Sequence, residues 1–310
     1  MHNMAAAAQL ASLLVLVVLL LVAAEQRARG AQRFHASASR HERIALRGAA
    51  RWLACAAGLL VFAAAFAVPM LQIVLWAWSV WRSDLNAEYW GYAWNTLYLG
   101  LITAGVTTLL ALLLAWVRRR HDDALTRWTV RIAVLGYALP GVVLAVGVFV
   151  PIAWLDAQLM AWLAPFGIDS LGILKGSLAA MLLALAARFL AVAFHATDSA
   201  MQRITRSQED ACASLGLTPW QTLRRLHLPL LRTGLLSAFL MVMVDVMKEM
   251  PITLMTRQFG WDTLAVRVFQ LTSESLWDQA ALPALAIVLV GVVPVVLLMR
   301  QTEPSPAQQK

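Results

Sequence analysis

The most distinctive polar residues form a basic stretch, 203–232, that separates two long apolar runs. This stretch predicts two short helices joined by a tight turn. The first extends to about Leu215, and Gly216 supplies the permissive backbone that commonly ends a helix. Thr218 can cap the second helix, because Gln221 follows at the spacing of a capping box.

The end of the second helix is predicted from a proline. A residue before proline is disfavoured in the helical region, so we expect this helix to stop at Leu228-Pro229. A short helix fixed at both ends on a membrane surface is suited to contact with a partner. The alternative is an amphipathic loop helix without a partner, as many transporters and receptors have.

A second group of chemically distinctive residues consists of charges inside apolar runs: Arg188 in one run, and Asp245, Lys248 and Glu249 in the next. An unpaired charge at mid-membrane costs roughly 2.5–3.5 kcal/mol, so such side chains face a cavity or a partner. The i+3 and i+4 spacings from Asp245 place these three charges on one helix face. Two interpretations stay open: the wall of a translocation path, or ion pairs near the outer interface with Arg188 as a structural partner.

Patterns of known catalytic chemistry are missing from the sequence. The run 172–177 lacks the spacing of a phosphate-binding loop, and there is no His-Glu-x-x-His or nucleophile elbow. Cys55 and Cys212 have no metal-ligand spacing, and the six histidines are scattered. We therefore expect a chain that is not an enzyme, with no catalytic residue and no bound metal or cofactor.

Composition indicates a membrane protein. Of the 310 residues, 61% are hydrophobic and only 14% are charged, and the mean hydropathy is +0.69. Several spans of about 20 apolar residues each account for this composition, whereas a soluble domain would lack polar surface. The net charge is +8, but the arginines cluster beside apolar spans, which argues against nucleic acid as a partner.

The predicted fold is all-α, with about seven transmembrane helices. The first is Ala5–Ala24, and the others are expected at about Leu53–Trp78, Trp94–Val117, Ile132–Trp154, Gly172–His195, Thr233–Met250 and Leu282–Met299. Pro140-Gly141 falls inside the fourth of these spans, and 253–282 is predicted to be the longest outer segment. The domains are then a transmembrane helix (1–24), a basic linker (25–51), a transmembrane domain (52–300) with its loop 203–232, and a polar tail (301–310).

Charge distribution predicts the orientation in the membrane. Nineteen of the 25 Lys and Arg residues fall in 25–51, 118–131, 203–232 and 300–310, against four in the intervening loops. Positive charge accumulates on the cytoplasmic side, so the linker, the loop 203–232 and the C-terminus are expected there. No Lys or Arg precedes the first apolar run, which favours a retained span with its N-terminus outside over a cleaved signal peptide.

At the loop a family resemblance becomes specific. The loop resembles the "EAA" loop of type I ABC importer permeases, through Asp210-Ala211-Cys212, Gly216, Leu226 and Leu228-Pro229 at matching spacing. Asp, Cys and Leu stand where that pattern has Glu, Ala and Ile. Glu209 directly precedes the motif, so either carboxylate is a candidate for the coupling role.

The resemblance implies partners. In that family the loop docks on an ATPase dimer that binds ATP, and the pore also needs a second permease domain and an external solute-binding protein. The chain would lie in the bacterial cytoplasmic (inner) membrane, with six spans forming the permease core. The first span and the linker are similar to the start of the second half of a tandem ferric-iron permease.

Alternatives remain at this stage. The same architecture serves thiamine, phosphonate and polyamine importers, so ferric iron is the expected substrate but not the sole candidate. A seven-span receptor or sensor would share the topology, but it would not explain the spaced motif. Whether the chain is part of a longer tandem permease or a natural half, and whether it pairs with itself, stays open.

Overall fold

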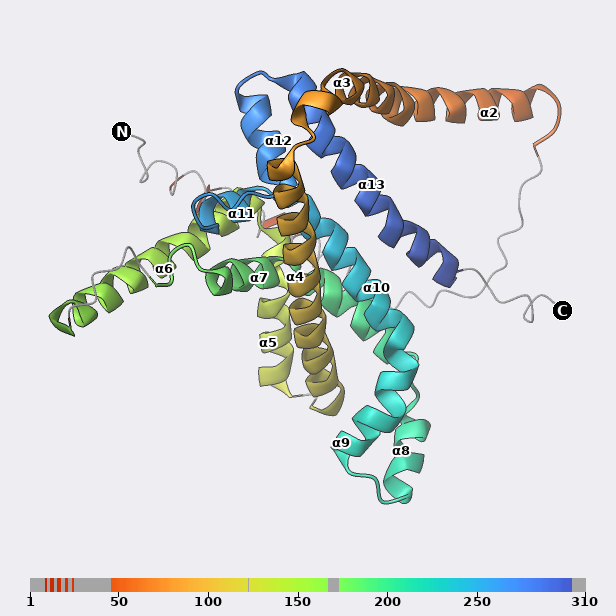
Figure 1. Cartoon of the computed structure of the whole chain (residues 1–310). Helices are drawn as coiled ribbons and strands as arrows, with labels where there is room; N and C mark the ends of the chain where they lie inside the picture. Colours follow the sequence, from red (N-terminus) through yellow and green to blue (C-terminus); the bar gives the residue numbers. More distant parts are fainter. Residues whose placement is uncertain are drawn as a thin grey trace.

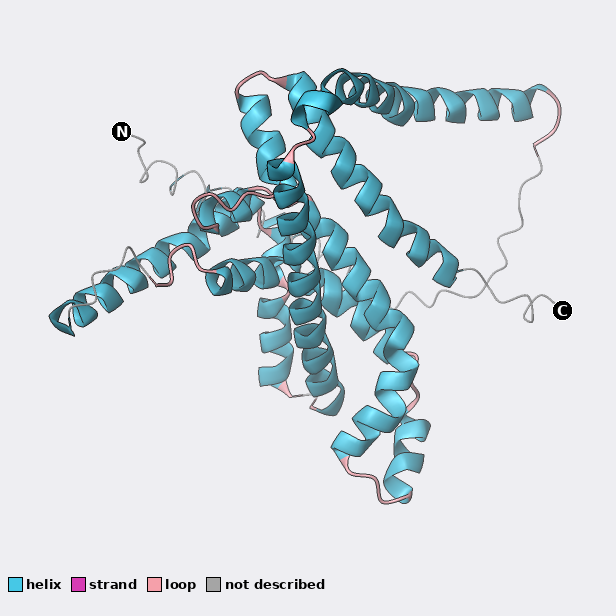
Figure 2. Ribbon diagram, viewed as in Figure 1, coloured by secondary structure: helices cyan, strands magenta, loops and turns pink. Residues whose placement is uncertain are grey.

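The structure is a computed structural model that describes residues 46–302, apart from 122 and 167–172, together with scattered helical positions between 9 and 24. Within these residues all regular elements are helical (Figure 2). The α-helices are α2 (Ala49–Phe62), α3 (Val68–Asp84), α4 (Ala87–Arg120), α5 (Ala124–Ala133), α6 (Gly141–Leu163), α7 (Leu178–Met201), α8 (Arg206–Ser214), α9 (Pro219–Thr222), α10 (Leu228–Met247), α11 (Pro251–Thr256), α12 (Leu264–Ser273) and α13 (Trp277–Thr302).

Six helical runs in the described part of the chain are long and apolar enough to cross a membrane. They are Ala49–Asp84, Ala87–Arg120, Gly141–Leu163, Leu178–Met201, Pro219–Met247 and Trp277–Val296. The predicted all-α membrane fold and its six core spans are thus confirmed. Most of the predicted span Ala5–Ala24, most of the linker 25–51 and most of the tail 301–310 lie outside the described residues.

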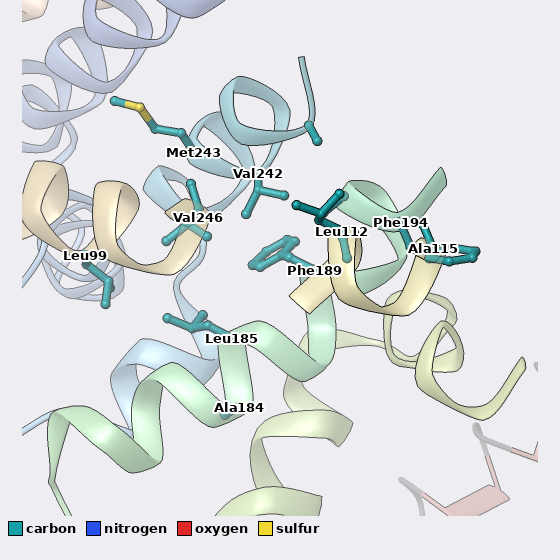
Figure 3. Packing of buried hydrophobic residues seen from close by; sticks show 14 of the residues in the cluster. Leu99, Leu112, Ala115, Ala184, Leu185, Phe189, Phe194, Val242, Met243 and Val246 are labelled. Atoms are coloured by element: carbon teal, nitrogen blue, oxygen red, sulfur yellow. The ribbon is translucent and has the colours of Figure 1, made fainter. Parts of the chain in front are cut away.

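Helices α4, α7 and α10 form the centre of the molecule and pack against one another (Figure 1). Leu112 of α4, Phe189 of α7 and Val242 of α10 are buried in their shared core (Figure 3). Close packing of this kind gains dispersion energy without a hydrophobic driving force from lipid, which suits helices that associate inside a membrane. The three helices therefore form the scaffold that positions the polar side chains.

Other helices extend outward from this centre. Helix α13 packs along α3 and α12, whereas α2 and α6 project away from the bundle (Figure 1). The apolar side chains of α2 are exposed, with Leu53 at 70% and Leu60 at 71%. Apolar surface of this extent is expected where lipid or a further transmembrane domain covers it.

Two π-helical turns carry the chain through prolines. The predicted stop at Leu228-Pro229 is wrong, because a π turn over Leu223–His227 leads directly into α10. A second π turn, Ala63–Ala67, stands at the same distance before Pro69. Proline lacks an N–H and its ring collides with the carbonyl four residues back, so a wider turn with i→i+5 bonds relieves both problems. The backbone N–H of Leu228 accordingly donates to the carbonyl of Leu223.

The predicted fourth span, Ile132–Trp154, is also wrong in its boundaries. The chain forms α5, then a 3₁₀ turn over Leu135–Ala138, and α6 begins only at Gly141. Pro140 is extended, with ψ 140°, and so separates the two helices. The break is packed closely against α7, because a Cβ added to Gly136 would lie 2.0 Å from the carbonyl oxygen of Ala187.

The predicted outer segment 253–282 contains most of α11, all of α12 and the start of α13, and it is tied to the start of α4. The Thr96 hydroxyl accepts a hydrogen bond from the N–H of Leu264 at 2.8 Å, and Asn95 Nδ2 donates to the carbonyl of Asp262 at 2.9 Å. These bonds give partners to polar groups at the ends of helices. The segment is thus a structured cap on the bundle.

The Gly136 contact can be tested by substitution. Gly136→Ala should destabilise the protein by about 1–3 kcal/mol, because the added methyl group meets a backbone carbonyl that cannot rotate away. Gly147→Ala is the control: no atom lies within 4 Å of its added Cβ, and alanine favours helix. Thermal unfolding of the detergent-solubilised proteins measures both effects, and equal melting temperatures would contradict the assigned packing.

Candidate functional site

The stretch 203–232 folds into two helices, as predicted. Helix α8 begins with a capping box in which Thr205 and Gln208 satisfy each other's backbone N–H groups. It ends with the N–H of Gly216 bonded to Ala213 at 2.9 Å and that of Leu217 bonded to Cys212 at 3.1 Å. These two bonds define a Schellman motif, in which Gly216 takes a φ of +75°.

The start of α9 is fixed as well. The Thr218 hydroxyl accepts from the N–H of Gln221, and the Gln221 side chain accepts from the N–H of Thr218 at 2.8 Å. The predicted capping box is confirmed. We call residues 205–222, with both helices and their turn, the α8–α9 hairpin. It stands at one end of the bundle, opposite α3 and α12 (Figure 1).

The predicted loop residues occupy both exposed and half-buried positions. Asp210, Ala211, Gly216 and Pro229 are exposed, whereas Cys212, Leu226 and Leu228 are half-buried. Two apolar side chains that sequence reasoning did not single out are the most conspicuous: Leu215 is 79% exposed and Trp220 is 56% exposed. Both are on the hairpin, so its surface combines apolar groups with the carboxylate of Asp210.

The two adjacent carboxylates have different environments. Glu209 is 24% exposed and accepts a bond from Arg119 Nε at 3.1 Å, and His227 Nε2 lies 2.9 Å from the same oxygen. Asp210 points to the exposed side of α8. The structure thus separates two residues that the sequence left equivalent. Nothing in the local sequence identified Arg119 or His227 as partners.

The charges within the bundle form two separate pairs. Arg188 Nε lies 3.2 Å from Glu249, which is 6% exposed and also accepts the N–H of Ile252 at 3.2 Å. Lys248 Nζ lies 2.8 Å from Asp245, and the Lys248 side chain is 63% exposed. The predicted pairing of Asp245 with Lys248 at i+3 spacing is confirmed, whereas Glu249 does not share that helix face, because α10 ends at Met247. The proposed alternative for Arg188, a partner of one carboxylate, is confirmed.

Asp245 faces a hollow between α7, α10 and the 134–138 segment. This hollow has a volume of about 640 Å³, and its polar lining groups are Tyr137, His195, Ser199 and Asp245. His195 and Ser199 were not predicted, although they follow Arg188 at 7- and 11-residue spacing, which corresponds to one helix face. In the described residues no cluster of three or more His, Cys, Asp or Glu side chains could hold a metal ion.

The geometry is thus that of a multi-span helical bundle with a hairpin of two capped helices at one end and paired charges inside. Residues 107–306 match the family described as the inner membrane component of binding-protein-dependent transport systems, and the chain belongs to this family. The family consists of transport components, so the expectation of a transport subunit is confirmed. The receptor alternative is set aside.

Similar proteins include permeases for two different substrates. The chain is 26% identical over 243 residues to the Fe(3+)-transport system permease protein FbpB 2 of Haemophilus influenzae, matching 77% of this chain and 45% of that protein. It therefore spans about half the length of that relative. It is 30% identical over 217 residues to the putative 2-aminoethylphosphonate transport system permease protein PhnV of Salmonella typhimurium, matching 69% of this chain and 75% of PhnV.

A solved structure shares the fold. It is a bacterial alginate ABC transporter in complex with alginate pentasaccharide-bound periplasmic protein. The match has a TM-score of 0.60 at 14% identity and covers 84% of this chain and 95% of that one. At this identity the similarity establishes the fold alone. It agrees with the predicted type I permease architecture.

The Arg188–Glu249 pair gives a prediction about stability. Arg188→Met should cost about 3–5 kcal/mol, because it leaves the buried Glu249 carboxylate without its cation. Adding Glu249→Gln should recover most of that loss. Lys248→Met is the control and should cost less than about 1 kcal/mol, since Lys248 is exposed. Thermal unfolding in detergent measures all three, and a double variant as unstable as Arg188→Met would contradict the pairing.

Proposed function

We propose that this chain is a permease subunit of an ATP-driven importer and that the α8–α9 hairpin docks on its ATPase subunit. The observation that carries the proposal is the hairpin itself. Both of its helices have capping boxes, and Leu215, Trp220 and Asp210 are exposed on it. A rigid element with an exposed aromatic anchor is suited to a protein interface. ATP is bound by that partner, since this chain has no phosphate-binding loop.

The proposed orientation places the hairpin in the cytoplasm. Arg118, Arg119 and Arg120 end α4 beside the hairpin, which itself contains or adjoins Arg203, Arg206, Arg224 and Arg225. Positive charge of this density favours the cytoplasmic side. The N-terminus then lies outside and the C-terminus inside, in the bacterial inner membrane. In this orientation the hairpin lies in the cytoplasm, the compartment in which the proposed ATPase subunits would bind it.

The importer also needs a second permease domain and an external solute-binding protein. Polar groups in spanning helices are too costly to face lipid, so the hollow beside Asp245 faces the translocation path and the second domain. The other charged residues near that path are Arg188, in the middle of α7, and Lys248 and Glu249, just beyond the end of α10. The exposed apolar surface of α2 offers further area for the second domain.

The substrate proposed is ferric iron. The supporting observation is that similarity to FbpB 2 covers 77% of this chain, more than the 69% for PhnV. The second candidate is 2-aminoethylphosphonate, favoured by the higher identity of 30% to PhnV. Both candidates use the same permease architecture, and the solute-binding protein supplies most of the selection.

Docking of the hairpin is tested by co-purification. Trp220→Ala should weaken ATPase binding by about 30-fold, the effect of losing roughly 2 kcal/mol at an interface anchor, and Asp210→Ala should also weaken it. Asp278→Ala, which removes an exposed carboxylate in the first turn of α13, should have no effect. Wild-type levels of ATPase with Trp220→Ala and Asp210→Ala would refute docking through this surface.

The substrate assignment is tested by uptake. Cells that express the complete transporter should accumulate radiolabelled Fe³⁺ in an ATP-dependent manner, and Asp245→Asn should reduce this uptake at normal protein level. Unlabelled 2-aminoethylphosphonate should not compete. Accumulation of labelled 2-aminoethylphosphonate in place of Fe³⁺ would support the second candidate and reject the first.

A further inference from the structure

The carboxylate of Glu209 connects three separate parts of the chain. Arg119, in the last turn of α4, reaches it with Nε at 3.1 Å and Nη2 at 3.2 Å. His227, the last residue of the π turn before α10, reaches it with Nε2 at 2.9 Å. Arg119 Nη2 also donates to the carbonyl of Ile204 at 2.8 Å, just before α8. We call Arg119, Glu209 and His227 the Glu209 cluster.

The environment of the cluster strengthens these bonds. His227 is only 3% exposed, and the side chains of Arg119 and Glu209 are 19% and 24% exposed. Charge-assisted hydrogen bonds in such partly shielded positions are stronger than exposed ones. Beside the cluster, a cavity of about 290 Å³ separates the hairpin from the end of α4. The hairpin is therefore held across a gap by polar contacts.

Apolar burial is confined to the two ends of the hairpin, where Ile204 and Leu223, the residues that flank it, are 4% and 3% exposed. Neither α8 nor α9 has a buried residue. A helix without a buried face is not fixed by hydrophobic burial, so its position depends on specific contacts. The Glu209 cluster supplies those contacts for α8.

The helices that meet at the cluster are long and continuous. Helix α4 runs without interruption from Ala87 to Arg120, about 50 Å at 1.5 Å per residue. The run that starts at Pro219 continues through the π turn to Met247 and carries Asp245. The Glu209 cluster thus lies where the hairpin meets α4 and the helical run Pro219–Met247, both of which extend through the bundle.

We propose that Glu209 is a positioning residue that clamps the hairpin to α4 and α10, so that both helices follow the hairpin when the ATPase moves it. The inference rests on the proposed docking of the hairpin and assigns different tasks to the two adjacent carboxylates. Glu209 faces inward and transmits the movement, whereas Asp210 faces outward and contacts the partner. Without the clamp, the hairpin moves with the ATPase while α4 stays behind.

The test measures the distance between the hairpin and α4 during the ATPase cycle. Spin labels are attached to Gly105→Cys on α4 and Ser214→Cys on α8, after Cys55 and Cys212 are replaced by serine. The site at Gly105 has no atom within 4 Å of an added Cβ, and Ser214 is exposed. The complete transporter, purified with its ATPase subunits, is compared without nucleotide and after trapping with ATP and vanadate. Pulsed electron–electron double resonance then measures the distribution of distances between the two spin labels.

With the intact clamp, the distance distribution should be the same in both states. Glu209→Gln and Arg119→Gln should each broaden it and shift it on trapping, while the ATPase still co-purifies. Arg120→Gln, the neighbouring exposed arginine, is the matched control and should behave like the wild type.

Three outcomes would overturn the proposal. One is a wild-type distance that changes on trapping, and another is a Glu209→Gln distance that does not. The third is loss of the ATPase with Glu209→Gln but not with Arg119→Gln, which would make Glu209 itself a docking residue. If no ATPase co-purifies with the wild type, the proposed docking fails, and this result is distinct from a failure of the clamp.

Discussion

In a membrane, every backbone N–H and C=O group has to find its partner inside the protein, and the structure depends on this constraint. It explains why the described spans are helices and why prolines are handled in two ways. Before Pro69 and Pro229 a π turn keeps the helical run continuous. At Pro140 the run is broken, and the break is packed against α7, where only glycine fits at position 136.

The same constraint applies to charged side chains. Arg188, in the middle of α7, and three charged residues at the end of α10 form two pairs of different character. Glu249 is buried beside Arg188 and also accepts a backbone N–H, which makes this pair part of the scaffold. Asp245 faces an open hollow, and its partner Lys248 is exposed, so this pair is accessible to solvent. Glu249 of the buried pair directly follows Lys248 of the accessible pair in the sequence.

Local sequence signals were sufficient to predict the caps of the hairpin. Contacts between residues far apart in the sequence could not be predicted from such signals. The caps at Thr218 and Gly216 depend on residues within five positions, so spacing alone predicted them. The partners of Glu209 come from the end of α4, 90 residues earlier, and from a π turn that no propensity predicts. The continuation of the helix through Pro229 was also missed. The rule that a residue before proline is disfavoured in a helix applies to ordinary α-turns, and the π turn before Pro229 avoids the conflict. Lys248 and Glu249 were placed on one face because the helix was predicted to continue to Met250, directly before Pro251, whereas α10 ends at Met247.

The π turn at Leu223–His227 has a consequence for the geometry of assembly. An α-helix advances by about 100° per residue, so the extra residue in this turn sets the direction in which the hairpin points around the α10 axis. Side-chain changes in the turn leave that angle unchanged, whereas removal of one residue would swing the hairpin by more than a quarter of a circle. The number of residues between Pro219 and Pro229 therefore sets the direction of the hairpin around the α10 axis, and with it the orientation of a bound partner relative to the membrane domain.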